Sequence, residues 1–382
     1  SQLTSTHLLF ECQDIPSIGY HVFWLGQSEL NPTSPSPQPQ DEFILETDQL
    51  RVIIDPETGN LSSIYDKINK WEILKELGNQ LQGFEDQGQY WDAWNIDPNY
   101  SQHPLPPATL QQIQWLERGE LQQRVQVIRQ LGQSDFIQEY ILQADSPWIK
   151  IATTVNWQDR HVMVKAAFPL TVEADFVTYE SPCGAVERTT RPQTPEEKAK
   201  WEVPALKWAD LSGEQRGVSL LNDCKYGYDA TPNQLRLTLL RGSNWPDPEA
   251  DLGWHQFTYC LYPHGGNWQS AKTVRQGYEL NLPLQVRLLE SVSDQGEKTL
   301  GLQESFLQLS GESLVLMAFK QSEIDATKWI LRCYESEGKT TELVVQEEWE
   351  SLQGVDLLED NLDQVWGQGE IVLISPWKVV SF

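Results

Sequence analysis

The histidines of this 382-residue chain are the first candidates for metal binding or proton transfer, but none is spaced for either task. HxxxH, HxH and HxD spacings, which place two ligands on one face of a helix or strand, do not occur at His7, His21, His103, His161, His255 or His264. GxSxG, the P-loop and GxGxxG before a helix are absent as well. The sequence therefore predicts no metal site and no catalytic residue in this chain.

Carboxylate pairs could supply a general acid and a general base, and the chain has several. They are Glu85 with Asp86, Asp92 with Asp97, and the acids between Asp247 and Asp251. A surface rich in Asp and Glu gives the same density without any catalytic role. The remaining combination with an imidazole, which an epimerase or hydrolase would need, is His255 and His264 with Glu249 and Asp251.

Two loop regions gather aromatic and acidic residues more densely than the rest of the chain. Residues 201–268 hold short Leu-rich strands around the loop GSNWPDPEADLGWHQ, and residues 78–97 read GNQLQGFEDQGQYWDAWNID. The second stretch is too polar for a core strand and too aromatic for a solvated loop. Aromatic, amide and acid side chains on loops of a β scaffold suit a polar ligand, although such loops also serve packing.

The composition excludes several classes of partner. A formal net charge of −27 argues against nucleic acid and anionic lipid, which are themselves polyanions. The five cysteines have no metal-ligand spacing, and we expect reduced, mostly buried thiols in a cytoplasmic protein. We find no signal peptide and no apolar run of membrane-spanning length, so no membrane partner is expected.

The chain reads as a succession of short strands. Alternating residues at 50–54, a turn at DPETGN and a return at 61–65 predict a β-hairpin, and residues 111–170 contain several alternating segments typical of an antiparallel sheet. No helical segment separates these strands, which excludes a parallel βαβ arrangement. The best helix start is Thr194 followed by Pro195 and two Glu, and it predicts a helix of one or two turns.

Changes in composition and strand pattern along the chain predict three parts. Residues 1–42 comprise a pair of N-terminal strands around a turn at Asp14–Gly19 and an exposed Pro-rich linker. Residues 43–270 form a large β-sandwich, and residues 271–382 form a small one after a polar connection at Ala271–Asn281.

Several long segments resemble one known family. GNQLQGFEDQGQYWDAWNID, KWEVPALKWADLS, GVSLLNDCKYGYD, LRLTLLRGSNWPDPEADLGWHQFTYCLYPH and LETDQLRVIIDPETGNLSSIYDK are similar to the C-terminal half of bacterial-type α-mannosidases of glycoside hydrolase family 38. The likeness extends over essentially the whole chain, to SFLQLSGESLVLMAFK and EIVLISPWKVVSF.

The resemblance implies an all-β fold, with a large antiparallel mutarotase-like supersandwich followed by a smaller C-terminal β-sandwich. It also implies a partner, the N-terminal catalytic domain of the same enzyme, which would supply the zinc and the nucleophilic Asp of a retaining α-mannosidase. No cofactor is expected in this chain itself, and we expect the chain alone to hydrolyse nothing.

The resemblance further implies which residues reach the rim of the α-mannoside site. Arg241 falls near the position where family members place an arginine close to the sugar, and it could donate to hydroxyl groups. Aromatic faces stack on pyranose rings while acids accept from hydroxyls, so the remaining substrate-binding candidates are Tyr90, Trp91, Asp92, Trp94 and Asp97.

Two alternatives stay open for these residues. YWDAW could instead pack against the catalytic domain, in which case the chain is a structural interface module, and exposure of that interface would favour a homo-oligomer. The large sandwich could also be an independent carbohydrate-binding module. A binding site would show aromatic and polar groups converging in a groove, whereas an interface would show a broad flat patch.

Overall fold

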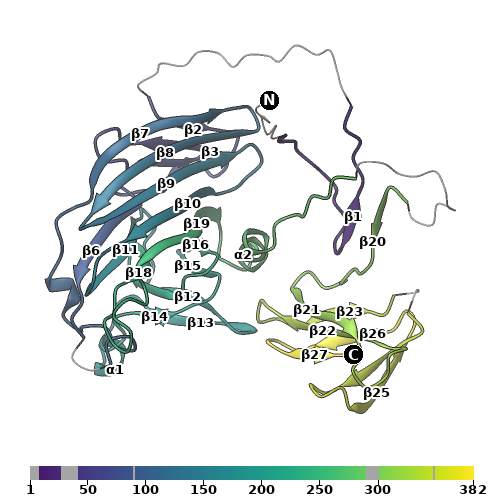
Figure 1. Cartoon of the computed structure of the whole chain (residues 1–382). Helices are drawn as coiled ribbons and strands as arrows, with labels where there is room; N and C mark the ends of the chain where they lie inside the picture. Colours follow the sequence, from purple (N-terminus) through teal and green to yellow (C-terminus); the bar gives the residue numbers. More distant parts are fainter. Residues whose placement is uncertain (1–7, 27–41, 89–90, 290–300, 347–348) are drawn as a thin grey trace. The chain divides into compact units, whose positions relative to one another are not determined.

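The computed structural model describes residues 8–26, 42–88, 91–289, 301–346 and 349–382 (Figure 1). Strands account for 49% and helices for 5% of the structure, and the sheets are antiparallel, so the predicted all-β class is confirmed. The described residues form two compact units. The larger one is built from residues 33–181 and 186–283, and the smaller one is built mainly from residues 284–382.

Three sheets form the larger unit. The nine-stranded sheet runs in the order β13, β12, β15, β16, β19, β10, β9, β8, β7 (Figure 1). Its strands are β7 (Thr109–Arg118), β8 (Gln122–Leu131), β9 (Ser134–Gln143), β10 (Ile149–Trp157), β12 (Phe176–Ser181), β13 (Gly184–Thr189), β15 (Trp208–Ser212), β16 (Arg216–Asn222) and β19 (Gly253–Gly265).

The second sheet of the larger unit has five strands in the order β14, β17, β18, β11, β6, and the third has four in the order β2, β3, β4, β5. The five are β6 (Gln80–Glu85), β11 (Val162–Pro169), β14 (Val203–Pro204), β17 (Gly227–Thr231) and β18 (Gln234–Arg241). The four are β2 (Ile44–Glu46), β3 (Leu50–Ile54), β4 (Leu61–Asp66) and β5 (Trp71–Glu72).

One apolar core joins these sheets. Strands such as β10 alternate buried and half-buried residues, so one face of the nine-stranded sheet packs inward. The core includes the buried side chains Val127, Phe136, Ile151, Val164, Leu220, Leu237 and Tyr259. β11 differs, because all eight of its residues are buried and both of its faces are therefore covered.

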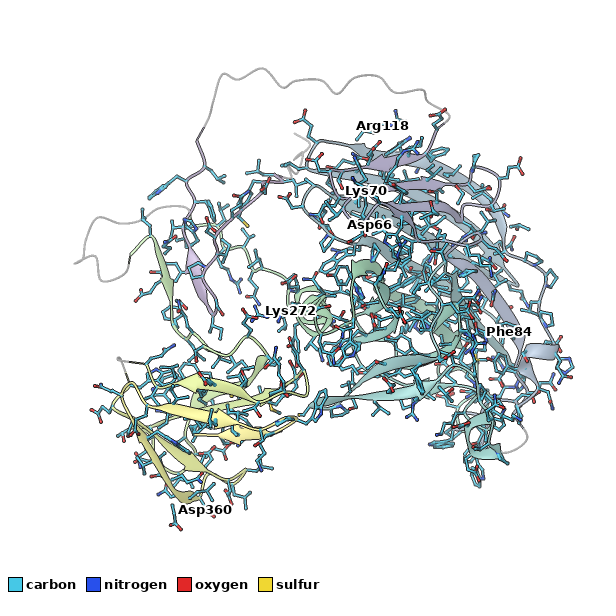
Figure 2. All side chains as sticks on the ribbon, turned by 180° about the vertical axis from the view of Figure 1, so that it is seen from behind. Asp66, Lys70, Phe84, Arg118, Lys272 and Asp360 are labelled. Atoms are coloured by element: carbon cyan, nitrogen blue, oxygen red, sulfur yellow. The ribbon has the colours of Figure 1, made fainter. Side chains whose placement is uncertain are left out.

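Short polar motifs close the hairpins where the sequence predicts them. After β4, the carboxylate of Asp66 accepts the backbone N–H groups of Ile68 and Asn69, each at 2.9 Å, and the indole N–H of Trp71 at 3.2 Å. Lys70 takes a left-handed φ of 55° before β5; Asp66 and Lys70 are labelled in Figure 2. Asp66 thus holds a turn at residues 66–69 that leads directly into β5.

Both α-helices described in the larger unit are short. α1 (Pro195–Lys198) has the capping box expected at Thr194, whose side chain accepts the Glu197 N–H at 3.2 Å. α2 (Thr273–Asn281) occupies the stretch interpreted as a polar connection, where the sequence analysis predicts no helix. It packs against β15 and β16, and Lys272 begins it with a left-handed φ and no side-chain cap, which leaves little helix signal in the sequence.

The smaller unit begins with β1 (Gly19–His21) paired to β20 (Gln303–Ser305). The predicted partner strand before Asp14 is wrong, because residues 8–13 are not in a strand. The Pro-rich linker lies mostly outside the described residues.

η1 (Tyr100–Gln102), a 3₁₀ turn, belongs to the larger unit.

The rest of the smaller unit is the predicted small sandwich. A five-stranded sheet runs β21, β22, β27, β24, β25, and a two-stranded sheet pairs β23 with β26. The strands are β21 (Leu314–Gln321), β22 (Trp329–Glu335), β23 (Thr341–Val344), β24 (Ser351–Val355), β25 (Asn361–Gly367), β26 (Ile371–Ile374) and β27 (Val379–Ser381). Phe382 exchanges two 2.9 Å backbone hydrogen bonds with Leu331, so this residue takes part in the hydrogen bonding of the sheet.

A polar network lies within the large core. The amide of Asn79 donates to the Tyr140 hydroxyl at 2.8 Å and accepts from the Tyr259 hydroxyl at 2.6 Å. Gln138 donates to the same Tyr259 oxygen at 2.8 Å. All four side chains are fully buried, so each unmade hydrogen bond would cost free energy.

We therefore expect Tyr259→Phe to lower the free energy of unfolding by about 1–3 kcal/mol, because Asn79 and Gln138 each lose a buried partner. Urea unfolding followed by circular dichroism would measure it. The control is Tyr226→Phe at a residue that is 60% exposed, which should change stability by less than about 0.5 kcal/mol. Equal effects of the two substitutions would contradict the importance of the network.

Candidate functional site

The register of β11 brings the two aromatic loops together. Met163 pairs with Phe84 of β6 on one side and with Arg241 of β18 on the other. Both β6 and β18 end at this point, so the segments that follow them, which begin at residues 86 and 242, start at the same end of the five-stranded sheet. Residues more than 150 positions apart thereby become neighbours.

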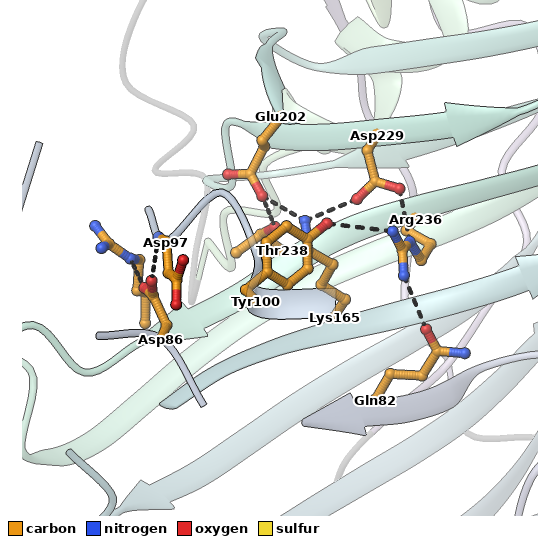
Figure 3. Close-up of polar contacts among 10 residues, drawn as sticks. Gln82, Asp86, Asp97, Tyr100, Lys165, Glu202, Asp229, Arg236 and Thr238 are labelled. Atoms are coloured by element: carbon orange, nitrogen blue, oxygen red, sulfur yellow. Dashed lines mark hydrogen bonds and ion pairs between the residues drawn. The ribbon is translucent and has the colours of Figure 1, made fainter. Parts of the chain in front are cut away.

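An ion pair joins the bases of these loops. The Arg241 Nε donates to the carboxylate of Asp86, which is buried, and the Arg241 Nη2 donates to the Asn95 carbonyl. The other Asp86 oxygen accepts the Asp97 backbone N–H at 2.7 Å (Figure 3). Arg241 therefore holds Asp86 and Asn95 close to the end of β18, and its side chain is only 17% exposed.

Asp92 makes the second connection between the loops. Its two carboxylate oxygens accept the backbone N–H groups of Asn244 at 2.6 Å and Trp245 at 2.8 Å. Burial acts to raise the pKa of Asp92, but these two hydrogen bonds, with His161 and Arg241 nearby, hold it below its ordinary value. Asp92 thus stays ionised and accepts hydrogen bonds within the protein.

Three indoles lie on top of this base, and we call Trp91, Trp94 and Trp245 the tryptophan surface. The Trp91 and Trp245 rings are 4.5 Å apart between centroids, and Trp94 lies 5.4 Å from Trp245. Their exposed fractions are 58%, 66% and 46% in sequence order. Indoles held at such exposure can stack on the C–H face of a pyranose.

Two polar atoms beside Asp92 have no partner among the described residues. The Asn244 side chain contacts the Nε2 of His161 at 2.5 Å, while the Oδ1 of Asn244 and the Nδ1 of His161 are buried without a hydrogen bond. Buried polar atoms are nearly always satisfied by protein, water or ligand. A buried acceptor and a buried ring nitrogen beside Asp92 therefore still need a partner, such as a water molecule.

A buried lysine holds the far end of the same loop. The Lys165 ammonium, fully buried on β11, contacts the carboxylates of Glu202 and of Asp229, the latter at 2.7 Å, and lies 5.1 Å from the centre of the Tyr100 ring (Figure 3). Arg236 donates to the other Asp229 oxygen at 2.6 Å and to the Tyr100 hydroxyl at 3.3 Å. We call these five residues the lysine cluster.

The lysine cluster is electrostatically balanced. Burial opposes the charge of Lys165, but Asp229 and Glu202 raise its pKa above the ordinary value. Tyr100 also packs edge-on against Phe84, with ring centres 5.2 Å apart; Phe84 is labelled in Figure 2. The cluster therefore attaches η1, and with it the loop 86–99, to the polar face of the five-stranded sheet.

The sequence-predicted candidates thus meet at one place, with different functions in the fold. Trp91 and Trp94 are exposed, whereas Asp92 and Arg241 hold the loops; Asp97 is half-buried and accepts the Asn99 N–H at 2.9 Å. Tyr90 lies outside the described residues. Sequence reasoning missed His161, Asn244 and Trp245, whose association with the loop 86–97 depends on the register of β11.

The other imidazole candidates do not form a catalytic group. His255 contacts the Asp251 carbonyl at 2.7 Å through its Nε2. His264 is buried, and its Nε2 contacts both Asp210, at 2.8 Å, and Ser219, at 3.2 Å. A catalytic triad needs the base and the orienting acid on different ring nitrogens, so this arrangement does not activate the Ser219 hydroxyl.

Metal ligation and membrane crossing can be assessed only for the part of the chain that the structure describes. There, no three His, Cys, Asp or Glu side chains gather where they could hold a metal ion. Within the same residues, helices are too short and too polar to span a bilayer. All five cysteines are free, but only Cys260 and Cys333 are buried, so the expectation of mostly buried thiols is wrong.

Comparison with known families accounts for nearly all of this architecture. Residues 45–249 match the family model "Glycosyl hydrolases family 38 C-terminal domain", and residues 313–382 match the "Glycosyl hydrolases family 38 C-terminal beta sandwich domain". The chain belongs to glycosyl hydrolase family 38, which confirms the resemblance seen in the sequence.

Individual relatives agree with this assignment. The chain is 34% identical over 345 residues to mouse alpha-mannosidase 2C1 and 33% identical over 307 residues to alpha-mannosidase G of Dictyostelium discoideum. These matches cover 85% and 78% of this chain but only 32% and 28% of those proteins, so the chain spans about three-tenths of their length. The fold resembles the crystal structure of an alpha-mannosidase from Enterococcus faecalis V583, with a TM-score of 0.77 at 16% identity, over 93% of this chain and 43% of that one.

The lysine cluster gives the first prediction for this site. Lys165→Met leaves two buried carboxylates without their cation, and we expect a loss of about 3–5 kcal/mol in the free energy of unfolding. The control is Lys67→Met, at a half-exposed lysine 3.0 Å from Glu46, which should cost less than about 1 kcal/mol. Thermal and urea unfolding would measure both, and similar losses would contradict the account.

Asp92 gives a pH-dependent prediction. The pKa of Asp92 is depressed in the folded protein, so its contribution to stability is present above the ordinary carboxyl pKa of about 4 and is lost as the pH falls through the folded value. Asp92→Asn should therefore destabilise by about 1.5–3 kcal/mol at neutral pH, because one charged acceptor is lost, and by less below about pH 3.

Urea unfolding of wild type and Asp92→Asn at several pH values would measure that gap. The control Glu57→Gln changes an exposed carboxylate by the same charge and should show little difference at any pH. A gap that stays constant from neutral to acid pH would show that the ionised carboxylate of Asp92 is not what holds the loops.

Proposed function

We propose that this chain is the C-terminal β region of a retaining, zinc-dependent α-mannosidase, and that it braces the catalytic domain and lines the rim of the α-mannoside cleft. The family assignment and the names of the relatives support the activity. In this proposal the N-terminal catalytic domain supplies the zinc and the nucleophile; among the described residues of this chain, no three His, Cys, Asp or Glu side chains gather where they could hold a metal ion.

One observation carries the rim assignment, namely that the tryptophan surface is exposed yet rigidly supported. Asp92 and Asp86 place the two loops by buried hydrogen bonds, so the indoles need not be ordered when a ligand binds. Of the five N–H donors of Arg241, two are used within the described residues, and the others can donate to sugar hydroxyls. The chain would thus orient the mannoside while the catalytic domain supplies the chemistry.

A second candidate is an independent carbohydrate-binding module, and the same exposed indoles favour it. The two candidates differ in what the chain does alone. A binding module retains affinity for a mannoside without the catalytic domain, whereas a rim needs the facing half of the cleft.

The thiols support a location for the whole enzyme. Cys224 is exposed and free, and Cys12 and Cys183 are half-buried and free. Accessible unpaired thiols are typical of a reducing compartment, and the location we propose is the cytoplasm.

Turnover of an aryl α-mannoside in the presence of zinc tests the proposal. We expect no turnover by this chain alone, and turnover when it is mixed with the separately expressed N-terminal remainder of its enzyme. Metal-dependent turnover by the chain alone would overturn the division of labour, and an active remainder that gains nothing from this chain would overturn the bracing role.

In the active mixture, Trp94→Ala should raise KM by up to about tenfold, because one stacking face worth about 0.5–1.5 kcal/mol is lost. Trp254→Ala removes an indole of the same 66% exposure on β19 and should leave KM unchanged. Unchanged KM in Trp94→Ala would remove the tryptophan surface from the rim.

A further inference from the structure

A cavity lies between strands of the five-stranded and the nine-stranded sheet, in the part of the larger unit that holds α1. Its volume is about 400 Å³, within the usual range of small-ligand sites of about 300–1,000 Å³. Residues of β12, β13, β17 and β18 line it together with the segment 192–203, and we call it the α1 pocket. None of its lining residues belongs to the tryptophan surface.

The lining of the α1 pocket carries no net charge. Three acidic side chains, Glu187, Glu197 and Asp229, face three basic ones, Arg188, Lys200 and Arg236. The chain as a whole carries a net charge of −27, so this balance is a property of the pocket and not of the composition. A bound anion or cation would find no compensating excess, so the pocket suits a neutral ligand with many polar groups.

Two guanidinium groups provide donors to such a ligand. Arg236 has five N–H donors, of which three are used by Asp229, Gln82 and Tyr100 within the described residues. The Nε of Arg188 is buried and has no hydrogen-bond partner in that part of the chain. An unsatisfied buried donor in a cavity wall indicates that a ligand or water completes it. The exposed Glu187 carboxylate can accept from a hydroxyl group.

Two aromatic side chains complete the chemistry. Trp201 and Phe176 line the pocket and are 41% and 53% exposed, although both are large apolar groups. Tyr179 and Tyr228 are buried beside them, and burial raises the pKa of each, so their hydroxyls remain neutral. Exposed aromatic faces beside planar charged side chains match a pyranose, which has a C–H face and a rim of hydroxyls.

The geometry points to the α1 pocket as a binding site for a neutral pyranoside, made from residues that the rim of the mannoside cleft does not use. The sugar ring stacks on Trp201 or Phe176, and its hydroxyls accept from Arg188 and Arg236 and donate to Glu187. This site does not rest on the α-mannosidase proposal, because it lies wholly within this chain.

Calorimetric titration of the 382-residue chain tests this site. The probes are methyl α-D-mannopyranoside, methyl β-D-glucopyranoside and methyl β-D-galactopyranoside at millimolar concentrations, with glucuronate as a charged comparison. We expect at least one neutral pyranoside to bind, and glucuronate to bind at least about tenfold more weakly because its charge is uncompensated.

Variants then locate the binding. Trp201→Ala and Arg188→Gln should each weaken it by roughly tenfold or more, through loss of one stacking face and of the orphan donor. Trp94→Ala, in the tryptophan surface, should leave it unchanged. Circular dichroism melts check that each variant is folded, and Phe176→Ala replaces Trp201→Ala if the latter is not.

The outcomes are distinguishable. Binding that is lost in Trp94→Ala and kept in Trp201→Ala belongs to the tryptophan surface and overturns the α1 pocket, although it supports the binding-module alternative. Absence of binding by every neutral probe, or equal binding of glucuronate, also overturns the proposal. Failure of the turnover assay with the α-mannoside has no bearing on it.

Discussion

The buried ammonium of Lys165 is the constraint on which the functional part of the larger unit depends. A lysine on a fully covered strand is tolerated only if its charge is compensated, and here Glu202 and Asp229 compensate it. Those carboxylates come from the segment before β14 and from β17. Compensating the charge of Lys165 therefore fixes the positions of β14 and β17 in the five-stranded sheet. It also places Asp229 in the wall of the α1 pocket and, through Tyr100, holds the end of the loop that carries Trp91 and Trp94.

Local structure was largely predictable from the sequence because its causes are local. Asp66 accepts backbone N–H groups two and three residues ahead, and Thr194 caps with Glu197, so each turn is determined by residues that stand together in the chain. The errors arise where partners decide the outcome. The apolar run at residues 8–10 has strand-forming residues but no neighbouring strand, and α2 owes its helix to packing on β15 and β16 rather than to a cap.

The candidate site was predictable in composition but not in assembly. Clustered Trp and Asp on two loops indicated a ligand surface, and the loops do meet. That Asp86, His161 and Asn244 meet carries no signal in the sequence, because their proximity follows from strand register across β6, β11 and β18. Arg241 shows the same limit in another way. Resemblance assigned it to the sugar, and the structure adds an ion pair with Asp86 that any substitution of Arg241 also breaks.

Charge distinguishes the two candidate surfaces physically. At the tryptophan surface, Asp86 and Asp92 accept hydrogen bonds from backbone N–H groups and Arg241, so the groups left for a ligand are mainly the three indoles, with the unused donors of Arg241 beside them. Arg236 lines the α1 pocket, and two of its five N–H donors are unused within the described residues while the others bond Asp229, Gln82 and Tyr100. A mainly aromatic surface selects ligands by their shape and apolar contact area. A pocket with unused hydrogen-bond donors selects ligands by the arrangement of their hydroxyl groups.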